Sequence, residues 1–296
     1  MFTQNSFDLD YYCRLFIKHL RRLNYSTETI KGYTKDLKKF KQYLHTEYSG
    51  NILTKEIQKE DLQDFLSFLE QNNLKPNSIC RNLSTLKSLY KFLVNEMNFD
   101  IDVAAKLKQP KVYTPLPNIL DFSEMQAFLD ASKRNSLFYY TMFSLLYYTG
   151  SRLSPIRLLL KDNVDLRNKQ IYFPKIKNGK DLYLPLNERM YEILSQYMSD
   201  YRHNGSDYVF HSPKSLNSPV SPSEIRLKMK AIAKTANIDK HLTPHIIRHC
   251  TATHLTILGA EQKYIASILG HSDLRSTARY QQLNVENLRS TINKLR

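Results

Sequence analysis

A histidine and an arginine in the C-terminal half of the chain have residue types and a spacing that suit the binding of a phosphate group. His245 and Arg248 are three residues apart, so they share one face of a helix, and Pro244 is well placed in the first turn of that helix. A guanidinium beside an imidazole suits a phosphate that gains negative charge on its non-bridging oxygens. Taken alone, however, the pair is better explained as a buried histidine beside a surface arginine.

Two other segments contain residues that can complete such a site. The segment TGSRLS contains Arg152, and the segment LGHS contains His271, which is followed nine residues later by Tyr280. Tyr280 is one of 20 tyrosines, so its residue type alone says nothing about its role. His249 follows Arg248 directly, and we expect it to face inward as a structural residue.

Read in chain order, these segments resemble the tyrosine recombinase (phage integrase) family. The pattern is TGSRLS, then HIIRH, then LGHS, then a tyrosine nine residues after the histidine. The resemblance covers nearly the whole chain, because YSTETIKGYTKDLKKF and SICRNLSTLKSLYKFLV look like the core-binding domain of that family. The segment THLTILGAEQKYIASILGHSDLRSTARYQQL is similar to the Xer branch, whose members resolve chromosome dimers.

The resemblance implies a role for each residue of the site. Arg152 and Arg248 would clamp the scissile phosphate of DNA. His245 and His271 would complete the pocket, and Tyr280 would be the nucleophile. The implied activity is the cleavage and rejoining of DNA strands at a specific site through a 3′-phosphotyrosyl intermediate.

The family also has a lysine on a β-hairpin between the two arginines. Lys177 is the best match because it directly precedes the Asn-Gly turn, and Lys180 is the second choice. Tyrosine is a weak nucleophile at its usual pKa of about 10, so it needs a base, and His245 can accept its proton. A lysine on a turn can protonate the leaving 5′ oxygen. Because the phosphotyrosine conserves the bond energy, religation needs no metal and no nucleotide cofactor.

One residue departs from the family pattern. The family usually has an acidic residue three positions after the first arginine, where this chain has Pro155. Asp162 and Asp165 are the nearby acids that are candidates to replace it. The change bears on how Arg152 and its neighbours are held, and it leaves the nucleophile and the two arginines in place.

The charge of the chain favours a polyanionic partner. The 296 residues include 43 Lys and Arg against 28 Asp and Glu, a formal net charge of +15. No run of about 18 apolar residues occurs, so a membrane-spanning helix is excluded, and the apolar stretch 137–149 is expected to be a core helix. Cys13, Cys80 and Cys250 are scattered singly, so no metal site is expected. A cytoplasmic, nucleoid-associated protein fits these features.

The first hundred residues indicate four helices, two of which carry basic faces suited to double-stranded DNA. Lysines flank an apolar stripe after Ser26, and cations alternate with short polar side chains after Pro76. Cations neutralise phosphates, and short polar side chains reach the backbone or the base edges. For one such helix alone, a solvated basic face is an equally good explanation. The predicted DNA-binding residues are Lys31, Lys35, Lys38, Arg81, Asn82, Ser84, Lys87 and Lys91.

The predicted fold is mainly α with a small β-sheet, in two domains that form a clamp around DNA. A helical core-binding domain of the SAM-like type spans residues 1–107, and a Pro-rich basic linker spans residues 108–118. An α+β tyrosine recombinase catalytic domain spans residues 119–296 and contains short strands at 170–173 and 181–186.

The last part of the chain predicts a short amphipathic helix with Val285, Leu288 and Ile292 inward. The plain interpretation packs this helix on its own domain. The resemblance favours docking on a neighbouring protomer, in a homo- or hetero-tetramer on DNA. A DNA translocase is a further partner that the Xer resemblance suggests.

Three alternative functions compete with a Xer-type resolution enzyme. A phage or mobile-element integrase of the same family would share this layout. A DNA-binding architectural factor that has lost catalysis has Pro155 as its only support. A type IB topoisomerase shares the tyrosine chemistry but is disfavoured by the Xer-like motifs and the short basic first domain.

Overall fold

The computed structural model describes residues 8–49, 53–112, 118–176, 180–201, 205–270, 289 and 291–295. Its contacts divide the chain into two units, Met1–Pro115 and Leu116–Arg296, each with a hydrophobic core of its own. The division falls inside residues 108–118, which the sequence indicates as a linker. Within the described residues, no helix combines the length and the apolar character needed to cross a membrane.

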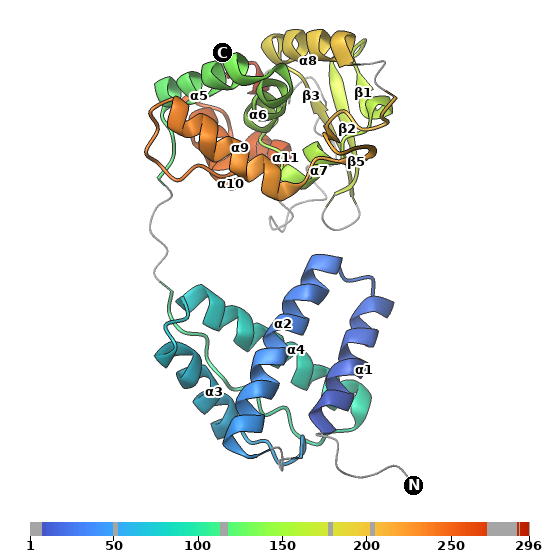
Figure 1. Cartoon of the computed structure of the whole chain (residues 1–296), viewed down its shortest axis with the longest axis vertical. Helices are drawn as coiled ribbons and strands as arrows, with labels where there is room; N and C mark the ends of the chain where they lie inside the picture. Colours follow the sequence, from blue (N-terminus) through green and yellow to red (C-terminus); the bar gives the residue numbers. More distant parts are fainter. Residues whose placement is uncertain are drawn as a thin grey trace. The chain divides into compact units, whose positions relative to one another are not determined.

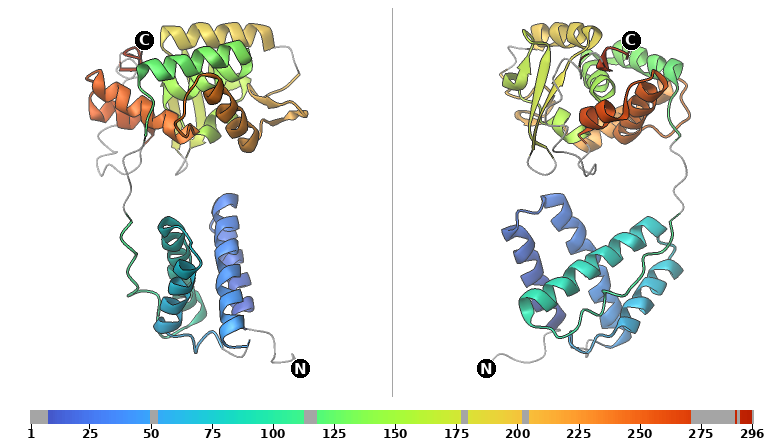
Figure 2. Two further views of the ribbon diagram at one scale, coloured as in Figure 1. Left: turned by 60° about the vertical axis from the view of Figure 1, so that its left-hand side comes forward. Right: turned by 180° about the vertical axis from the view of Figure 1, so that it is seen from behind.

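The N-terminal unit contains the helices α1 (Asp8–Arg22), α2 (Thr27–Glu47), α3 (Lys59–Gln71) and α4 (Pro76–Met97). Figure 2 shows α1 beside α2 and α3 beside α4, and α2 also contacts α4. Local residues define the helix ends. The Ser26 hydroxyl accepts the backbone N–H of Thr29 at 3.2 Å and caps α2, while Pro76 opens α4, where its missing N–H costs nothing.

The core of this unit is made from apolar positions that recur at helical spacing. Phe16 of α1, Phe40 of α2, Phe65 of α3 and Leu89 of α4 are fully buried or nearly so. The rings of Phe40 and Phe65 have centroids 5.0 Å apart, a tilted aromatic contact. Because these positions lie on one side of each helix, many of the lysines of α2 remain on the outer side.

The C-terminal unit combines seven described α-helices with two small antiparallel sheets (Figure 1). The helices are α5 (Phe122–Asn135), α6 (Leu137–Thr149), α7 (Leu153–Arg157), α8 (Glu188–Tyr201), α9 (Pro222–Thr235), α10 (Pro244–Ile257) and α11 (Gln262–Leu269). One sheet has the order β1 (Val164–Asp165), β2 (Gln170–Ile176), β3 (Lys180–Pro185), and the other pairs β4 (His211–Ser212) with β5 (Ser215–Pro219). The prediction of a mainly α fold with a small sheet is confirmed.

Helix α6 is the centre of the C-terminal unit, as expected for the apolar stretch 137–149. Every residue from Tyr139 to Thr149 is buried, and α6 contacts α5, α8 and α10. Gly150 ends the helix with φ +59°, and a Cβ at this position would lie 2.7 Å from Leu269 Cδ2 and 3.1 Å from Thr251 Cγ2. The end of α6 therefore packs directly against α10 and α11, in a backbone conformation that suits glycine.

The last described residues of the chain pack on their own unit. Ile292 and Leu295 are buried, and the Leu295 carbonyl accepts the Asn187 side-chain amide at 2.8 Å. Lys294 Nζ donates to the Gly259 carbonyl at 3.3 Å. Ile292 faces inward as predicted and packs on its own domain, and docking of this segment on a neighbouring protomer stays a prediction. Val285 and Leu288 lie outside the described residues.

Candidate functional site

Helix α10 positions the histidine and the arginine from which the site is built. Its first turn is fixed by Thr243, whose hydroxyl accepts the backbone N–H of Ile246 at 3.2 Å, and by Pro244. His245 and Arg248 lie on this one helix, as their spacing predicts. His245 is exposed, whereas Arg248 is only 6% exposed. The guanidinium of Arg248 is therefore held from inside the protein.

Arg248 joins the three sequence segments that the family resemblance singles out. Its Nη1 donates to the Gly150 carbonyl at 2.8 Å, and its Nη2 donates to the Leu269 carbonyl at 2.7 Å. Gly150 lies two residues before Arg152, and Leu269 lies two residues before His271. One buried side chain thus ties the backbone of TGSRLS and LGHS to the helix of HIIRH.

The electrostatics of this cluster suit an anion. Burial and, to a smaller extent, the nearby positive charge of Arg152 lower the pKa of Arg248 to about 10. Burial also lowers the pKa of His245, followed by the effects of His249, Arg248 and Arg152. At neutral pH the site therefore contains two guanidinium charges beside an uncharged imidazole, which can accept a proton.

The prediction that His249 faces inward is wrong. His249 is exposed, one turn after His245 on the same face of α10, and their ring centroids are 6.2 Å apart. The structural histidine is His254, which is 1% exposed. Its two ring nitrogens lie 2.9 Å from the Tyr147 hydroxyl and 3.0 Å from the Leu120 carbonyl, so both are hydrogen-bonded.

Pro155 is compatible with the local backbone. It is the third residue of α7, and the N–H groups of a first helical turn have no partner within the helix. Asp165 accepts the backbone and side-chain amides of Asn168 at 3.0 and 2.7 Å, and Asp162 is exposed. Across the described residues, neither Arg152 nor Arg248 forms an ion pair with a carboxylate. The missing acid is not replaced by Asp165, which is engaged in its own turn.

Three predicted residues, Lys177, His271 and Tyr280, lie outside the described residues. The two strands around Lys177 are described: β2 and β3 pair as predicted, with Ile176 opposite Lys180. Tyr172 and Tyr183 face each other across these strands, with ring centroids 4.7 Å apart in a stacked arrangement. The hairpin that the family resemblance requires is therefore present.

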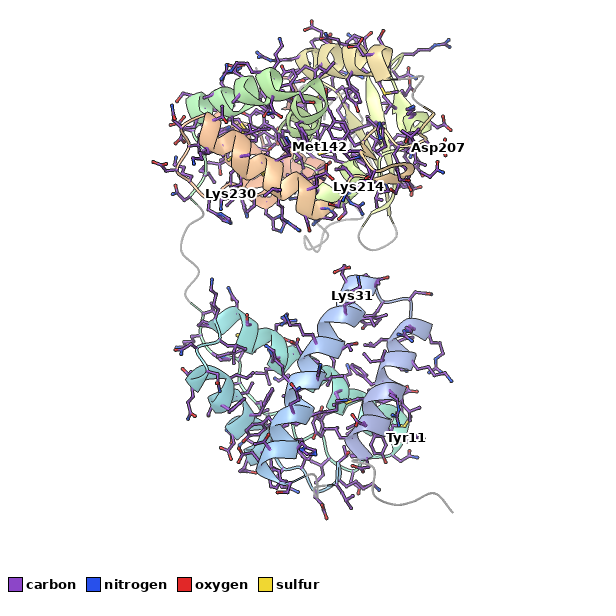
Figure 3. The ribbon with its side chains drawn as sticks, in the orientation of Figure 1. Tyr11, Lys31, Met142, Asp207, Lys214 and Lys230 are labelled. Carbon is purple, nitrogen blue, oxygen red and sulfur yellow. The ribbon has the colours of Figure 1, made fainter. Side chains whose placement is uncertain are left out.

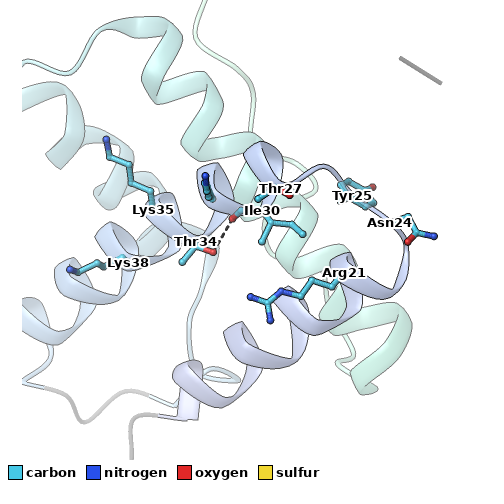
Figure 4. Close-up of a pocket in the computed structure, with 9 residues that line it drawn as sticks. Arg21, Asn24, Tyr25, Thr27, Ile30, Thr34, Lys35 and Lys38 are labelled. Atoms are coloured by element: carbon cyan, nitrogen blue, oxygen red, sulfur yellow. Dashed lines mark hydrogen bonds between the residues drawn. The ribbon is translucent and has the colours of Figure 1, made fainter. Parts of the chain in front are cut away.

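Three of the predicted DNA-binding lysines lie along one groove of the N-terminal unit. Lys31, Lys35 and Lys38 of α2 line a groove of about 800 Å³ at the corner between α1 and α2 (Figure 4). Lys31 projects from the N-terminal half of α2 (Figure 3). Its Nζ pairs with Glu28 at 3.1 Å. The same groove is lined by Arg21, Asn24 and Tyr25, which the sequence reasoning missed because they precede the expected helix.

Helix α4 presents only part of the face predicted for DNA contact. Arg81 and Lys91 are exposed, and Ser84 and Lys87 are half-buried, with their side chains bonded to the Cys80 and Ala105 carbonyls. Asn82 is 1% exposed, and its amide donates to the Ser78 carbonyl at 2.7 Å. The prediction that Asn82 contacts DNA is wrong, because α4 packs against α1, α2 and α3 and so has a narrower free face than a lone amphipathic helix.

Comparison with known proteins agrees with these features. The model of the phage integrase family matches residues 118–287, and the model of its N-terminal SAM-like domain matches residues 14–97. The chain belongs to the phage integrase family. Tyrosine recombinase XerD of Staphylococcus saprophyticus is 31% identical over 277 residues, which are 91% of this chain and 92% of that protein. The resemblance to tyrosine recombinases and to their Xer branch is confirmed.

Solved structures show the same fold. The integrase-family chain is similar to XerA recombinase with a TM-score of 0.51 and 26% identity, covering 97% of this chain and 99% of that one. A λ integrase tetramer bound to a Holliday junction gives a TM-score of 0.73 at 16% identity, covering 92% of this chain and 76% of that one. At this low identity, the λ integrase likeness shows the shared fold alone.

Proposed function

We propose that this protein is a Xer-type site-specific recombinase that resolves chromosome or plasmid dimers. The observation that carries the proposal is the junction at Arg248, which brings the backbone of all three integrase segments to one point. The relatives named tyrosine recombinase XerD, which match nearly the full length of this chain, support the same function. A phage or mobile-element integrase of the same family is the second candidate.

The phosphate is held by the two arginines. A DNA phosphodiester repels nucleophiles because it is negatively charged, so guanidinium groups at Arg152 and Arg248 neutralise and orient it. The carbonyl bonds to Arg248 fix the plane of its guanidinium before DNA binds. His271 completes the pocket. Because these groups stabilise negative charge that grows in the transition state, they speed the cleavage step in addition to binding the phosphate.

Two proton transfers accompany cleavage. His245, uncharged at neutral pH, accepts the phenolic proton as the Tyr280 oxygen bonds to phosphorus. The bond from phosphorus to the 5′ oxygen breaks, and Lys177 protonates that oxygen. The product is a 3′-phosphotyrosyl enzyme and a free 5′ hydroxyl. Religation reverses these steps on another strand, so the reaction proceeds without a metal ion and without ATP.

The partner is double-stranded DNA. The basic residues of α2 and α4 bind its backbone, and four protomers act together, as the λ integrase tetramer bound to a Holliday junction suggests. A paralogous subunit can supply part of that tetramer, and the C-terminal segment then links neighbours. The protein works in the cytoplasm on nucleoid DNA.

A suicide substrate tests this function. A duplex nicked close to the cleavage site releases a short fragment after attack, which traps the covalent protein–DNA adduct. We expect an adduct with the wild-type chain in EDTA and without nucleotide, and none with Tyr280→Phe. Tyr264→Phe, which removes a hydroxyl from α11, is the matched control and should form the adduct normally.

Two outcomes would contradict the proposal. An adduct that survives Tyr280→Phe would show that another residue is the nucleophile. Relaxation of any supercoiled plasmid at equal rates, without dependence on a site, would identify a topoisomerase. A site found beside the gene itself, and used for insertion of a DNA circle, would favour the mobile-element integrase.

A further inference from the structure

A carboxylate is buried beneath the basic face of the N-terminal unit. Asp36 lies on α2 and is 2% exposed. Its Oδ1 is 2.8 Å from Nη2 of Arg81, and its Oδ2 accepts the Thr85 hydroxyl at 3.1 Å. Arg81 and Thr85 are one turn apart on α4, so Asp36 binds two successive turns of that helix. This acid joins the two helices that carry all the predicted DNA-binding residues.

The burial of this acid needs an explanation beyond stability. Burial raises the pKa of Asp36, which means that the ionised form is disfavoured by its surroundings, and Arg81 is the main group that opposes this effect. Buried ion pairs add little net stability on average, because the loss of hydration offsets the attraction. A negative charge here also weakens the attraction of the unit for DNA. A role in orienting Arg81 would explain why the unit keeps a buried carboxylate despite its loss of hydration and its repulsion of DNA.

The Arg81 guanidinium lies between its ion-pair partner Asp36, the surface of α2 and solvent. Its side chain is 44% exposed, although its ion-pair partner is buried. Gly32 lies one turn before Asp36 on α2, and a Cβ at Gly32 would be 3.6 Å from Nη1 of Arg81. The guanidinium therefore lies against the surface of α2 at its one glycine, held by Asp36 on one edge and open to solvent elsewhere.

We propose that Asp36 is a positioning residue that holds the Arg81 guanidinium in the orientation in which it binds a DNA phosphate. Arginine has five donors in a planar fork, so a buried carboxylate that attracts the guanidinium from one side limits where the fork lies and leaves its donors for the phosphate. Lys35 and Lys39, on α2 beside Asp36, add positive charge to the same surface. The inference rests on the proposed DNA-binding function of this unit.

The direction of one charge-removing substitution tests the inference. Coulomb's law alone predicts that Asp36→Asn in the full chain tightens DNA binding, because a negative charge is lost. Positioning predicts the reverse: weaker binding to a mixed-sequence duplex, by about tenfold, with a salt dependence shallower by about 0.9 in log K against log salt, the loss of one phosphate contact. Fluorescence anisotropy over a salt series measures both quantities.

Glu28→Gln is the matched control, because it removes the same charge from the exposed surface of α2, where Glu28 pairs with Lys31. We expect this variant to bind DNA as tightly as the wild type or more tightly. Arg81→Ala should reproduce the loss seen in Asp36→Asn, and the double variant should be no weaker than Arg81→Ala alone. Additive losses would overturn the inference, as would unchanged or tighter binding by a folded Asp36→Asn.

A second variant keeps the test decisive if Asp36→Asn does not fold. Arg81→Lys changes a half-exposed side chain and keeps its charge but removes the planar fork. Positioning predicts a loss of affinity close to that of Arg81→Ala, and retention of wild-type affinity would overturn it. These measurements use binding alone, so they are independent of whether the suicide substrate forms an adduct.

Discussion

The two units of the chain hold an arginine by different means. In the N-terminal unit, the carboxylate of Asp36 lies 2.8 Å from the Arg81 guanidinium. In the C-terminal unit, two peptide carbonyls, of Gly150 and Leu269, accept both terminal nitrogens of Arg248. The two hydrogen bonds fix the plane of the Arg248 guanidinium, whereas the ion pair places an opposite full charge against that of Arg81.

The difference matches what each arginine has to do. A carbonyl carries only a partial negative charge, so in the proposed mechanism the positive charge of Arg248 stays available to a phosphate in the transition state. In the N-terminal unit, affinity is spread over several basic residues, so partial neutralisation of Arg81 is tolerable in exchange for orientation. Pro155 agrees with this difference. It stands where the family usually has an acid near Arg152, so no carboxylate at that position opposes the positive charge of the C-terminal site.

The largest effect is expected at Arg248. Arg248→Lys keeps the charge but replaces a fork that donates to two carbonyls with a single nitrogen. We expect adduct formation on the suicide substrate to slow by about 100- to 1000-fold, and the free energy of unfolding to fall by about 2 kcal/mol. Single-turnover kinetics and urea denaturation measure these changes. A near-wild-type rate would show that carbonyl anchoring does not matter.

A substitution at Gly150 tests the backbone position whose carbonyl accepts Nη1 of Arg248. Gly150→Ala adds a Cβ 2.7 Å from Leu269 Cδ2 at a left-handed backbone position. We expect a loss of about 2–4 kcal/mol, the sum of backbone strain and overpacking, and slower cleavage. Gly259→Ala is the control, because Gly259 has φ +76° and nothing within 4 Å of an added Cβ. Its loss should be about 1–2 kcal/mol, from backbone strain alone, and equal losses would contradict the packing argument.

The two units should also respond differently to pH. Burial lowers the pKa of His254, so its stabilising contribution is present above the ordinary histidine pKa of about 6.5 and is lost as the pH falls through and below that value. The pKa of Asp36 is raised, so its contribution runs in the other direction and is lost as the pH rises through its pKa. Between pH 7 and 5, the C-terminal unit should lose up to about 1 kcal/mol per pH unit.

Hydrogen exchange followed by mass spectrometry resolves the two units in one experiment. As the pH is lowered from 7 to 5, the protection of α6 and α10 should decrease more than the protection of α2 and α4, after correction for intrinsic exchange rates. His254→Gln should flatten the response of the C-terminal unit. An unchanged response in that variant would assign the pH dependence to other groups.

The smallest effect is expected for a single lysine of the α1–α2 groove. Lys38→Ala should weaken duplex binding a few-fold and make the salt dependence shallower by about 0.9. Because Lys38 and Arg248 belong to different units, the rate of adduct formation at saturating DNA should stay the same. A lower rate at saturation would contradict the assignment of DNA affinity to the N-terminal unit and of cleavage to the C-terminal unit.

Local patterns in the sequence determined much of this protein. Helix positions, the neighbouring strands β2 and β3 and the apolar core helix follow from spacing between near neighbours, which a sequence displays directly. The basic character and the family also follow from the sequence. The His245–Arg248 spacing predicts one shared helix, and the structure contains it.

The tertiary structure decided which side chains are inside. His249 and His254 lie on one helix and differ only in what packs against each face, and Asn82 is buried because three helices surround α4. The anchors of Arg248 lie 98 and 21 residues away along the chain. Burial and hydrogen bonding depend on such distant neighbours, whereas helical periodicity depends on near ones. For that reason the sequence identified the arginines, and only the fold showed how each is held.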